Sequence, residues 1–446
     1  MKFGGKTVLI IGLKRTGVSV ARFIAQCGGQ VRITDRQSKS QLKDDLAQIV
    51  DIAPEVCVGT EDETLLSGID LVVPSPGVPR TAPLLVKARQ RGIPVWSEIE
   101  LASRFLSAPV LAVTGTNGKS TTTTLIGECL REQGQRVFVG GNLGTPLLDA
   151  VNGDYEVVVA EVSSFQLEWV EQFRPRIGIW LNLTEDHLDR HGTLTAYGEA
   201  KRALFLRQEP TDWAIVNRED PEVQRFTQGL PGQLFSFGWE PISHGIWVDL
   251  ASKILVVSRA GQETYISLAG LRLYGRHNLE NVMAAVGAAI LWGIPVDVIE
   301  RVLARFTGLR HRLELVATKQ GVAYFDDSKG TNVGAVVQSL GSFDGPIILL
   351  AGGVDKGGDY SPLRHLVQTK VRKLILFGTA REIIASALGN ATETLVVDTL
   401  ADAVRAAAAN ACVGDTVLLS PACASFDQFR NYAHRGEVFR AAVEAL

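Results

Sequence analysis

One short stretch, Val110–Thr124, constrains the fold of this chain more than any other. It reads VLAVTGTNGKSTTTT, so an apolar, β-branched run passes directly into a loop bracketed by Gly115 and Gly118. Glycines let several backbone N–H groups turn toward one anion, and a helix that follows adds the positive end of its dipole. The stretch therefore predicts a phosphate-binding loop between a buried strand and a helix. The glycines enclose two residues, where the usual pattern has about four, and the competing interpretation is an ordinary glycine-rich turn.

Three side chains near this loop have the chemistry of a phosphate site. Lys119 would neutralise the charge of a terminal phosphate, and the hydroxyl of Ser120 would reach a magnesium ion. Glu161 ends a run of buried-strand character, and in ATP sites an acid at such a strand end commonly holds Mg²⁺. The alternative for Glu161 is a helix-capping or surface carboxylate. Together the three residues indicate a ligand that carries phosphate and uses magnesium.

A cluster of acids and histidines, Thr184–Gly192, follows the apolar strand predicted over Ile177–Leu183. His187 lies in this cluster. Polar clusters just beyond a strand end are more often functional than solvated turns. We therefore interpret the cluster as part of the site, with a solvated turn as the alternative.

Two further segments have ordinary interpretations when they are read alone. Lys201 lies in a helical segment, where a lysine is most simply a surface residue. Asn278 and Asn281 open a long alanine-rich helix, and they would be ordinary capping residues.

The N-terminal part alternates short apolar runs with helical segments such as Gly17–Gln26. Alternation of strand and helix predicts a parallel sheet of Rossmann type. The predicted strands are Thr7–Ile11, Val31–Thr34, Leu71–Val73 and Ile93–Trp96.

The first strand is followed by a segment, Gly12–Gly17, that resembles a dinucleotide fingerprint, with Asp35 about 20 residues further on. Lys14 stands where the second glycine would let the backbone contact a pyrophosphate, so a nicotinamide or flavin site is disfavoured. A diphosphate held with the help of Lys14 or Arg15 fits the segment, and a tight strand–helix turn is the alternative.

The C-terminal part repeats the strand–helix alternation, and polar loops follow three of its strands. Ligands bind at the carboxyl ends of strands in open α/β sheets, so three such loops are expected to converge on one cleft edge. The alternative is that they are unrelated solvated loops. The loops are Asp326–Asn332, Gly352–Gly358 and Ser420–Ser425, and the strands are Val322–Phe325, Ile347–Ala351, Lys373–Phe377, Leu395–Val397 and Thr416–Leu419.

Length and composition set the domain number and limit the partners. A chain of 446 residues predicts about three domains, which we place at 1–97, 98–307 and 308–446. A net charge of −3 argues against nucleic acid or an anionic membrane as the main partner. Five widely spaced cysteines indicate neither a disulfide framework nor a zinc site, which fits the cytoplasm. No signal peptide is apparent, and the most apolar later stretch, Val282–Val296, is too short to span a bilayer.

The motifs GTNGKST, EVSSFQLE, LNLTEDHLDRH and GRHNLEN together resemble the Mur ligase family over essentially the whole chain. Within that family, DDSKGTN and SPACASFDQFRNYAHRG resemble the members that add D-glutamate to UDP-N-acetylmuramoyl-L-alanine. The resemblance implies an ATP-dependent amide ligase of peptidoglycan precursor biosynthesis, acting through an acyl phosphate. We expect the protein to be a monomer in the cytoplasm. It also implies three α/β domains: a Rossmann-like N-terminal domain, a P-loop ATP-binding central domain with a mixed sheet, and a Rossmann-like C-terminal domain.

The resemblance also assigns roles to individual positions. Lys119, His187 and Lys201 are implied to be catalytic, and Lys201 to react with CO₂, forming a carbamate. The implied ATP-binding residues are Gly115, Thr116, Asn117, Gly118, Lys119, Ser120, Thr121, Asn278, Asn281, Arg312 and Asp327. The implied ligands of two Mg²⁺ ions are Ser120, Glu161, His187 and the modified Lys201. The implied contacts to the UDP-linked substrate are Arg15, Thr16, Asp35, Gly77, Asn142 and His187. The implied D-glutamate contacts are Thr331, Lys356, Ser425 and Tyr432.

Two other hypotheses fit parts of the sequence. One is a different amide ligase on the same scaffold, such as a folylpolyglutamate synthetase. The other is a nucleotide-dependent switch that binds ATP without a ligase step. The switch gives no purpose to Lys201 or to the three polar loops of the last domain.

Overall fold

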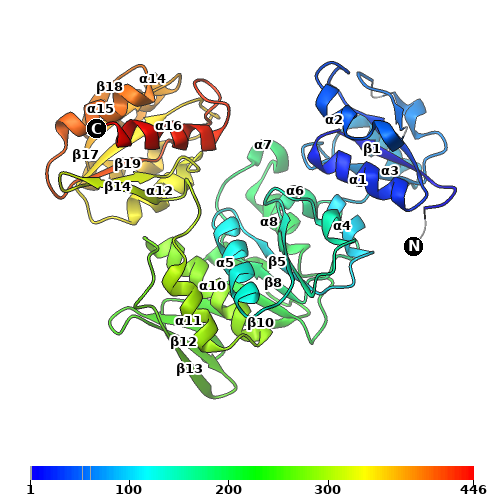
Figure 1. The fold of residues 1–446 in the computed structure, drawn as a ribbon, viewed down its shortest axis with the longest axis horizontal. Helices are drawn as coiled ribbons and strands as arrows, with labels where there is room; N and C mark the ends of the chain where they lie inside the picture. The colour runs from blue at the N-terminus through cyan, green and yellow to red at the C-terminus, as the bar shows by residue number, and fades with distance from the viewer. Residues whose placement is uncertain (1–2, 53, 61) are drawn as a thin grey trace. The chain divides into compact units, whose positions relative to one another are not determined.

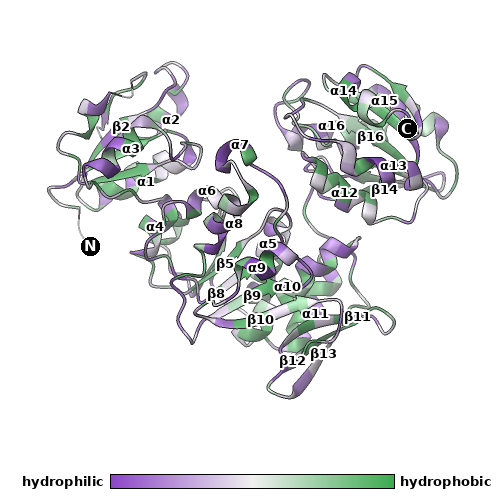
Figure 2. Ribbon diagram, turned by 180° about the vertical axis from the view of Figure 1, so that it is seen from behind, coloured by the Kyte–Doolittle hydropathy of each residue, from purple (hydrophilic) through white to green (hydrophobic). Residues whose placement is uncertain are grey.

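The described residues form three separate β-sheets, each covered by helices (Figure 1). The computed structural model describes residues 3–52, 54–60 and 62–446. The sheets correspond to the three α/β domains that the sequence predicts. Figure 2 shows hydrophobic residues concentrated in the strands, whereas helices and loops carry most of the hydrophilic ones. This is the pattern expected of sheets buried beneath crossover helices.

The first sheet is parallel, with the strand order β3-β2-β1-β4. Strands β1 and β4 are apolar, and α1 buries Val20, Phe23 and Ile24. The carboxyl ends of β1, β2 and β4 therefore lie side by side at one edge. The elements are β1 (Thr7–Ile11), α1 (Arg15–Gln26), β2 (Gln30–Thr34), α2 (Lys43–Ala47), η1 (Val50–Ile52), β3 (Glu55–Val56), η2 (Glu63–Leu66), β4 (Leu71–Pro74) and α3 (Pro83–Gln90).

The strand predicted over Ile93–Trp96 is wrong in extent. The structure has a single parallel bridge there, between Val72 and Val95. The N–H of Val72 donates to the carbonyl of Pro94 at 2.9 Å, and the N–H of Trp96 donates to that of Val72 at 3.0 Å. Pro94 has no N–H of its own, so the ladder does not extend in that direction.

The second sheet has the order β13-β12-β11-β10-β9-β8-β5-β7-β6 and is mixed, as expected. Its neighbours pair in parallel from β6 to β11, and the last two pairings are antiparallel. Strand β5, which precedes the phosphate loop, is buried throughout between β7 and β8. The strands are β5 (Val110–Thr114), β6 (Val137–Gly141), β7 (Val157–Glu161), β8 (Ile177–Trp180), β9 (Trp213–Asn217), β10 (Gln233–Gly238), β11 (Gly245–Asp249), β12 (Ile254–Arg259) and β13 (Gln262–Ser267). The helices are α4 (Glu98–Ser103), α5 (Lys119–Glu132), η3 (Leu147–Ala150), α6 (Ser164–Leu167), α7 (Leu188–His191), α8 (Leu194–Arg202), α9 (Pro221–Phe226), α10 (Arg276–Trp292) and α11 (Val296–Arg305).

The third sheet has the order β14-β15-β19-β16-β17-β18, and β14 is its one antiparallel strand within the described residues. Strands β15, β19 and β16 are adjacent, so the three polar loops that follow them share one edge. The elements are β14 (Glu314–Lys319), β15 (Val322–Asp326), α12 (Val333–Gly341), β16 (Ile347–Gly352), η4 (Ser361–Leu363), α13 (Arg364–Lys370), β17 (Val371–Phe377), α14 (Arg381–Leu388), β18 (Glu393–Val396), α15 (Leu400–Asn410), β19 (Thr416–Leu419) and α16 (Tyr432–Glu444).

The three sheets are distributed over two compact units. One unit runs through Ser267 and includes Val282–Val302, so it holds the first two sheets. The other comprises Leu268–Asn281 and Leu303–Leu446, so it holds the third. The division passes through α10. The domain limits of 97 and 307 stay predictions.

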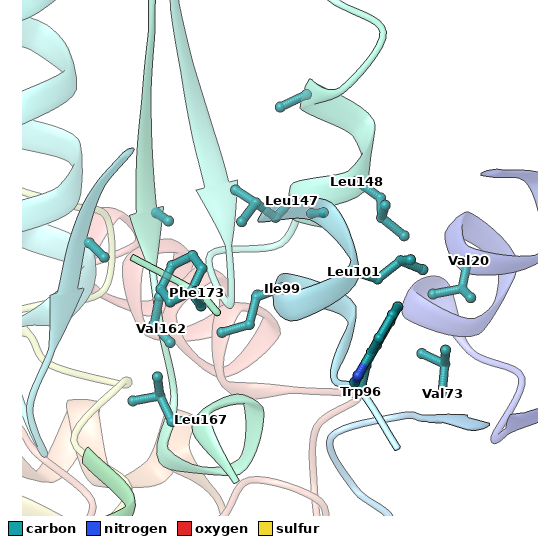
Figure 3. Close-up of a cluster of buried hydrophobic side chains, with 14 of the residues drawn as sticks. Val20, Val73, Trp96, Ile99, Leu101, Leu147, Leu148, Val162, Leu167 and Phe173 are labelled. Carbon is teal, nitrogen blue, oxygen red and sulfur yellow. The ribbon is translucent and has the colours of Figure 1, made fainter. Parts of the chain in front are cut away.

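Trp96 joins the first two sheets into one unit. Its side chain is buried in a cluster that contains Val20 and Val73 of the first domain and Leu101 and Leu148 of the second (Figure 3). The guanidinium of Arg104 lies 3.7 Å from the centroid of the indole ring, a cation–π contact. The hydrophobic core is therefore continuous between the first and second domains.

No helix in the described part of the chain is both long enough and apolar enough to traverse a lipid bilayer.

Glu98 is a buried carboxyl group beside this junction. One of its oxygens accepts the N–H of Leu148 at 2.6 Å, and the side chain is almost fully enclosed. Burial raises the pKa of Glu98 to about 7, with a smaller contribution from the charge of Asp149, against the opposing effect of the backbone N–H groups of Leu147 and Leu148. A carboxyl of this kind couples the stability of the junction to pH.

We predict that Glu98 makes stability fall as pH rises. Between pH 4.5 and about 7 the folded protein keeps a proton that the unfolded chain has released, so the loss over this window is roughly 3 kcal/mol. Glu98→Gln keeps the acceptor oxygen and removes the titration. The difference in unfolding temperature, variant minus wild type, should therefore increase from pH 5 to pH 8, measured by thermal unfolding at each pH. Parallel profiles for the two proteins would contradict this assignment.

Candidate active site

The phosphate loop has the backbone that the sequence predicts. Gly118 caps α5 with φ of 86°, a left-handed conformation that glycine adopts without strain. A Cβ atom on Gly115 would lie 3.1 Å from Cβ of Leu181 and 3.3 Å from the backbone nitrogen of Asn182. The loop is thus packed so closely that a larger residue at Gly115 would push it out of place. It leads directly into the N-terminus of α5, whose partial positive charge favours an anion.

Asn182, which sequence reasoning missed, holds the loop in shape. Its side-chain oxygen accepts the N–H of Asn117 at 2.8 Å, and its amide donates to the carbonyl of Asn117 at 3.2 Å. The backbone carbonyl of Asn182 accepts the N–H of Thr116 at 3.0 Å. Because Asn182 follows β8, the neighbouring strand defines the loop. The LNLT segment of the sequence was the available signal.

Two lysines donate to the same carbonyl oxygen in this loop. Nζ of Lys119 lies 2.9 Å from the oxygen of Gly115 and 2.8 Å from that of Thr116. Nζ of Lys201 lies 2.8 Å from the oxygen of Gly115. The site therefore concentrates positive charge where the loop would receive phosphate.

Lys201 is buried, so its interpretation as a surface lysine is wrong. Only 1% of the residue is exposed, and its ammonium lies 4.5 Å from the ring centroid of Tyr197, one turn earlier on α8. Burial, together with the charge of Lys119, holds the pKa of Lys201 well below its ordinary value, although Asp186 and Glu161 oppose the shift. Lys201 lies on the face of α8 that packs toward the phosphate loop. The sequence of so short a helix does not show which of its faces is buried.

Glu161 ends β7 beside β5 and is buried. One carboxylate oxygen accepts the side-chain N–H of Asn142 at 2.6 Å. The other oxygen, Oε2, is enclosed and has no hydrogen-bond partner within the part of the chain that the structure describes. A buried carboxylate oxygen without a partner is costly unless a cation binds it. Oxygen donors of this kind suit Mg²⁺, so the residues present fit a magnesium ion.

His187 precedes α7 in a left-handed conformation, with φ of 55°. Its ring lies 4.8 Å from that of Phe165, and Nε2 lies 3.7 Å from a carboxylate oxygen of Asp186. Partial burial lowers the pKa of His187, and the charges of Lys201 and Lys119 add to this, while Asp186 opposes it. The lowered pKa favours the neutral imidazole, the form in which histidine binds a metal.

Asp35 connects the loops that follow β1 and β2 in the first domain. Asp35 accepts the N–H of Leu13 at 2.7 Å through one oxygen and that of Gln37 at 2.8 Å through the other. Asp35 therefore shapes the turn between β1 and α1, in which Arg15 and Thr16 begin the helix.

Two of the predicted substrate contacts reach the second domain. The guanidinium of Arg15 lies 3.5 Å from the position that a Cβ on Gly144 would occupy, in the same loop as Asn142. The carbonyl of Gly77 accepts a hydrogen bond from Arg190 at 3.4 Å. The predicted contacts for the UDP-linked substrate and the phosphate loop thus belong to the same compact unit.

The remaining predicted residues lie in the second unit. Asn278 and Asn281 are inside α10, not at its cap: the amide of Asn278 donates to the carbonyl of Tyr274 at 2.8 Å. Oδ2 of Asp327 accepts the hydroxyls of Ser339 and Ser420, each at 2.7 Å. Capping therefore does not explain the asparagine pair.

The charge of Arg312 affects the pKa values of two buried groups in this unit, Asp327 and His277. Burial raises the pKa of Asp327 to about 6, and the charge of Arg312 is among the opposing influences. Burial lowers the pKa of His277 to about 4, and Arg312 adds to that shift. Arg312 therefore lies within electrostatic range of the start of α10 and of the loop after β15.

The polar loops of the last domain share contacts, as predicted. Nζ of Lys356 lies 3.4 Å from the hydroxyl of Thr331, which joins the loops after β16 and β15. Ser425 is buried, and Tyr432 is 36% exposed, with Nζ of Lys329 4.1 Å from its ring centroid. The four residues expected to bind the amino acid thus lie in or beside the three loops.

Arg435 connects all three loops, and sequence reasoning missed it. It is fully buried, and its guanidinium donates to the carbonyls of Ser328 at 2.9 Å and Cys423 at 3.1 Å. Two longer bonds of 3.4 Å reach the carbonyls of Gly352 and Ala424. Burial lowers the pKa of Arg435 to about 10, so the group is still charged at neutral pH.

His311, Glu314 and Asp326 form a cluster of metal-ligand type in the same unit. Their atoms already bind one another: Nδ1 of His311 lies 2.7 Å from Asp326, and the N–H of His311 donates to Glu314 at 2.9 Å. The guanidinium of Arg440 also donates to Glu314. We therefore interpret the cluster as a buried polar network that fixes the residue before Arg312.

Comparison with known proteins gives a consistent result over the whole chain. Three family models match: "Mur ligase MurD-like, N-terminal domain" at residues 6–97, "Mur ligase middle domain" at 113–289 and "Mur ligase, glutamate ligase domain" at 311–423. The chain is 46% identical to the UDP-N-acetylmuramoylalanine–D-glutamate ligase of Syntrophotalea carbinolica, covering 100% of this chain and 99% of that one. It is 47% identical to the protein of the same name from Geotalea daltonii, with the same coverage.

A solved structure is similar in fold. The UDP-N-acetylmuramate-alanine ligase MurC from Thermotoga maritima matches with a TM-score of 0.59 and 18% identity, covering 99% of each chain.

We predict that Arg435→Lys loosens the three loops together. Lysine cannot reach four carbonyls from one position, and each buried carbonyl left without a donor costs about 1–3 kcal/mol. Hydrogen exchange, measured by mass spectrometry, should become faster in 326–332, 352–358 and 420–425 at once. Arg440→Lys, on the same helix, is the control and should change exchange only near Glu314. Faster exchange in one loop alone would contradict this role of Arg435.

Proposed function

The chain belongs to the Mur ligase family, and from this premise we propose how its residues join D-glutamate to UDP-N-acetylmuramoyl-L-alanine. The reaction is an ATP-dependent ligation in peptidoglycan synthesis. Full-length relatives are named as ligases of UDP-N-acetylmuramoylalanine and D-glutamate. The observation that carries the assignment to this chain is the phosphate loop with two lysines on one carbonyl. A site of this kind concentrates positive charge for a triphosphate.

The chemistry requires activation of a poor electrophile. The carboxylate of the UDP-linked alanine attacks the γ-phosphorus of ATP, ADP leaves, and an acyl phosphate forms. The amine of D-glutamate then bonds to the acyl carbon, phosphate leaves with the electrons of the C–O bond, and the nitrogen loses a proton. Protein groups mainly position the reactants and stabilise phosphoryl charge.

The phosphate loop and α5 supply the triphosphate site. The loop Gly115–Thr121 and the N-terminus of α5 receive the triphosphate, and Lys119 leaves its carbonyl partners to contact phosphate oxygens. The N–H groups of Thr116 and Asn117 donate to Asn182 and hold the loop in shape. Asn278 and Asn281 contact the adenine, Asp327 the ribose, and Arg312 the phosphates. Burial of Asp327 and of the asparagines supports this role, since it lets their polar atoms recognise a ligand with little competition from water.

Ser120, Glu161 and His187 would hold Mg²⁺, which supplies charge neutralisation for the phosphates when it is bound. The enclosed Oε2 of Glu161 supports this. We propose two ions, the second with a ligand from Lys201.

Lys201 is proposed to carry a carbamate. The ammonium first loses a proton, the neutral amine then bonds to the carbon of CO₂, and the nitrogen releases a second proton. The side chain thus changes from a cation to an anion. The enclosed position of the amine, beside Lys119 and on the carbonyl of Gly115, supports the modification. The change of sign removes a repulsion from Lys119 and provides an oxygen ligand for a cation.

The two other substrates occupy the loops described above. Arg15, Thr16, Asp35 and Gly77 contact the uridine diphosphate, and Asn142 and His187 contact the sugar-linked acid. Thr331, Lys356, Ser425 and Tyr432 hold D-glutamate, with Lys356 as a partner for one of its carboxylates. All of these residues come from one chain, and we propose a monomer acting in the cytoplasm, where ATP is available.

The decisive experiment is a phosphate-release assay. We expect purified protein with ATP and Mg²⁺ to release phosphate only when both UDP-N-acetylmuramoyl-L-alanine and D-glutamate are present. L-Glutamate and D-alanine serve as controls for the amino acid, and UDP-N-acetylmuramate serves for the acceptor. Equal release with L-glutamate would overturn the assignment of the substrate.

The carbamate has its own test. Lys201→Ala should lower kcat by about a hundredfold or more, because an anion in the site is lost, and a small carboxylate such as acetate should restore part of the activity. Lys119→Ala is the control, since an added anion cannot replace its cation. ¹³C NMR of wild type in labelled bicarbonate should show a carbamate signal that Lys201→Ala lacks. Absence of that signal in wild type, or full activity of Lys201→Ala, would refute the modification.

A further inference from the structure

Arg190 links three segments that lie far apart in the sequence. Its Nε and Nη2 atoms donate to the two carboxylate oxygens of Glu168 at 3.1 and 2.7 Å. Nη2 also donates to the carbonyl of Val78 at 2.7 Å, and Nη1 donates to that of Gly77 at 3.4 Å. All three nitrogens of the guanidinium are therefore in use.

The linked segments are those that the proposed function assigns to two ligands. Gly77 and Val78 belong to the loop after β4, at the edge where the UDP-linked substrate is proposed to bind. Glu168 ends the segment that begins with Glu161, and Arg190 lies on α7, which His187 precedes. One side chain thus connects the substrate loop of the first domain to the proposed metal ligands of the second.

The environment of Arg190 fixes its position. Only 11% of the Arg190 side chain and 3% of the Glu168 side chain are exposed. The guanidinium also lies 4.8 Å from the ring centroid of Phe165. The next residue, His191, contacts the hydroxyl of Ser164 at 3.0 Å and lies 3.8 Å from Glu168. Short helix α7 is therefore anchored to α6 through two consecutive side chains.

Adhesion between the domains does not require this ion pair. The core around Trp96 already joins the first two domains through apolar contacts. A buried ion pair adds little stability compared with apolar residues of similar size, but it imposes a definite geometry. The planar fork of arginine can bind a carboxylate and two carbonyls together, which the single ammonium of lysine cannot do.

We propose that Arg190 is a positioning residue for the UDP-linked substrate. It holds the loop Ser75–Val78 at a fixed distance from the segment that carries His187, and it thereby sets where the sugar-linked carboxylate lies relative to the phosphate loop. The inference rests on the proposed function, because it takes its substrate from there. It adds a residue that touches neither the phosphate nor the amino acid.

The test compares Arg190→Lys and Arg190→Gln with wild type. In both variants the Kd for UDP-N-acetylmuramoyl-L-alanine, measured by calorimetry without ATP, and its KM should rise about tenfold or more, because small misplacements are costly. The KM values for ATP and D-glutamate should stay within about twofold, since Asn182 holds the phosphate loop and Arg435 holds the loops of the last domain. Glu168→Gln should change the same two constants in the same direction.

Arg104→Lys is the matched control. Arg104 is similarly buried and pairs with Glu100 at 2.7 Å and with Glu171 at 2.9 Å in the same unit. Within the described residues it has no hydrogen bond or ion pair with the loop Ser75–Val78. For Arg104→Lys, the KM values for UDP-N-acetylmuramoyl-L-alanine, ATP and D-glutamate should stay within about twofold of wild type. The proposal is contradicted if Arg190→Lys keeps the wild-type Kd and KM for UDP-N-acetylmuramoyl-L-alanine while Arg190→Gln raises both. In that case the positive charge is sufficient, and the planar guanidinium has no positioning role.

An equal rise in all three KM values with a lowered unfolding temperature would also overturn the proposal, because it would indicate a general loss of structure. Failure of the proposed function is a separate result: wild type would then release no phosphate with the substrate pair. The calorimetric Kd would still report on Arg190, since it requires binding and no turnover.

Discussion

The carbonyl oxygen of Gly115 accepts hydrogen bonds from two lysines, and the rest of the site depends on this contact. Two ammonium groups that share one carbonyl oxygen repel each other. One carbonyl dipole offsets part of that cost, and an anion offsets the rest. The arrangement therefore favours any ligand that brings negative charge to the loop. Burial, together with the charge of Lys119, keeps the pKa of Lys201 low, and Glu161, with its enclosed oxygen, ends the neighbouring strand.

Much of the fold and the position of the site loops could be predicted from the sequence, because strand ends and glycine loops are local patterns. The run before Gly115 predicts a buried strand, and the polar segments after β15, β16 and β19 predict a shared edge once the sheet is parallel. The pattern is weaker where one residue interrupts a ladder, and Pro94 reduces a predicted strand to one bridge.

Side-chain partners over long sequence distances could not be predicted. Lys201 reaches Gly115 across 86 positions, and Arg435 reaches Ser328 across 107. Nothing near either residue in the sequence distinguishes it from a surface cation, because burial depends on which helix face meets which loop. The family motifs supplied the role of Lys201, but they did not reveal that Arg435 or Arg190 connects separate loops. These contacts are properties of the packed fold.

The buried cations of this protein fall into two kinds, and the difference bears on function. Arg190 and Arg104 pair with carboxylates, so their charge is neutralised and their geometry is what remains. Arg435 donates to backbone carbonyls instead. A carbonyl orients a cation without cancelling its charge, so a positive potential persists beneath the three loops of the last domain. D-Glutamate is an anion. A carboxylate partner for Arg435 would stabilise the empty protein and weaken the attraction for this ligand, which is a physical reason for carbonyl partners there.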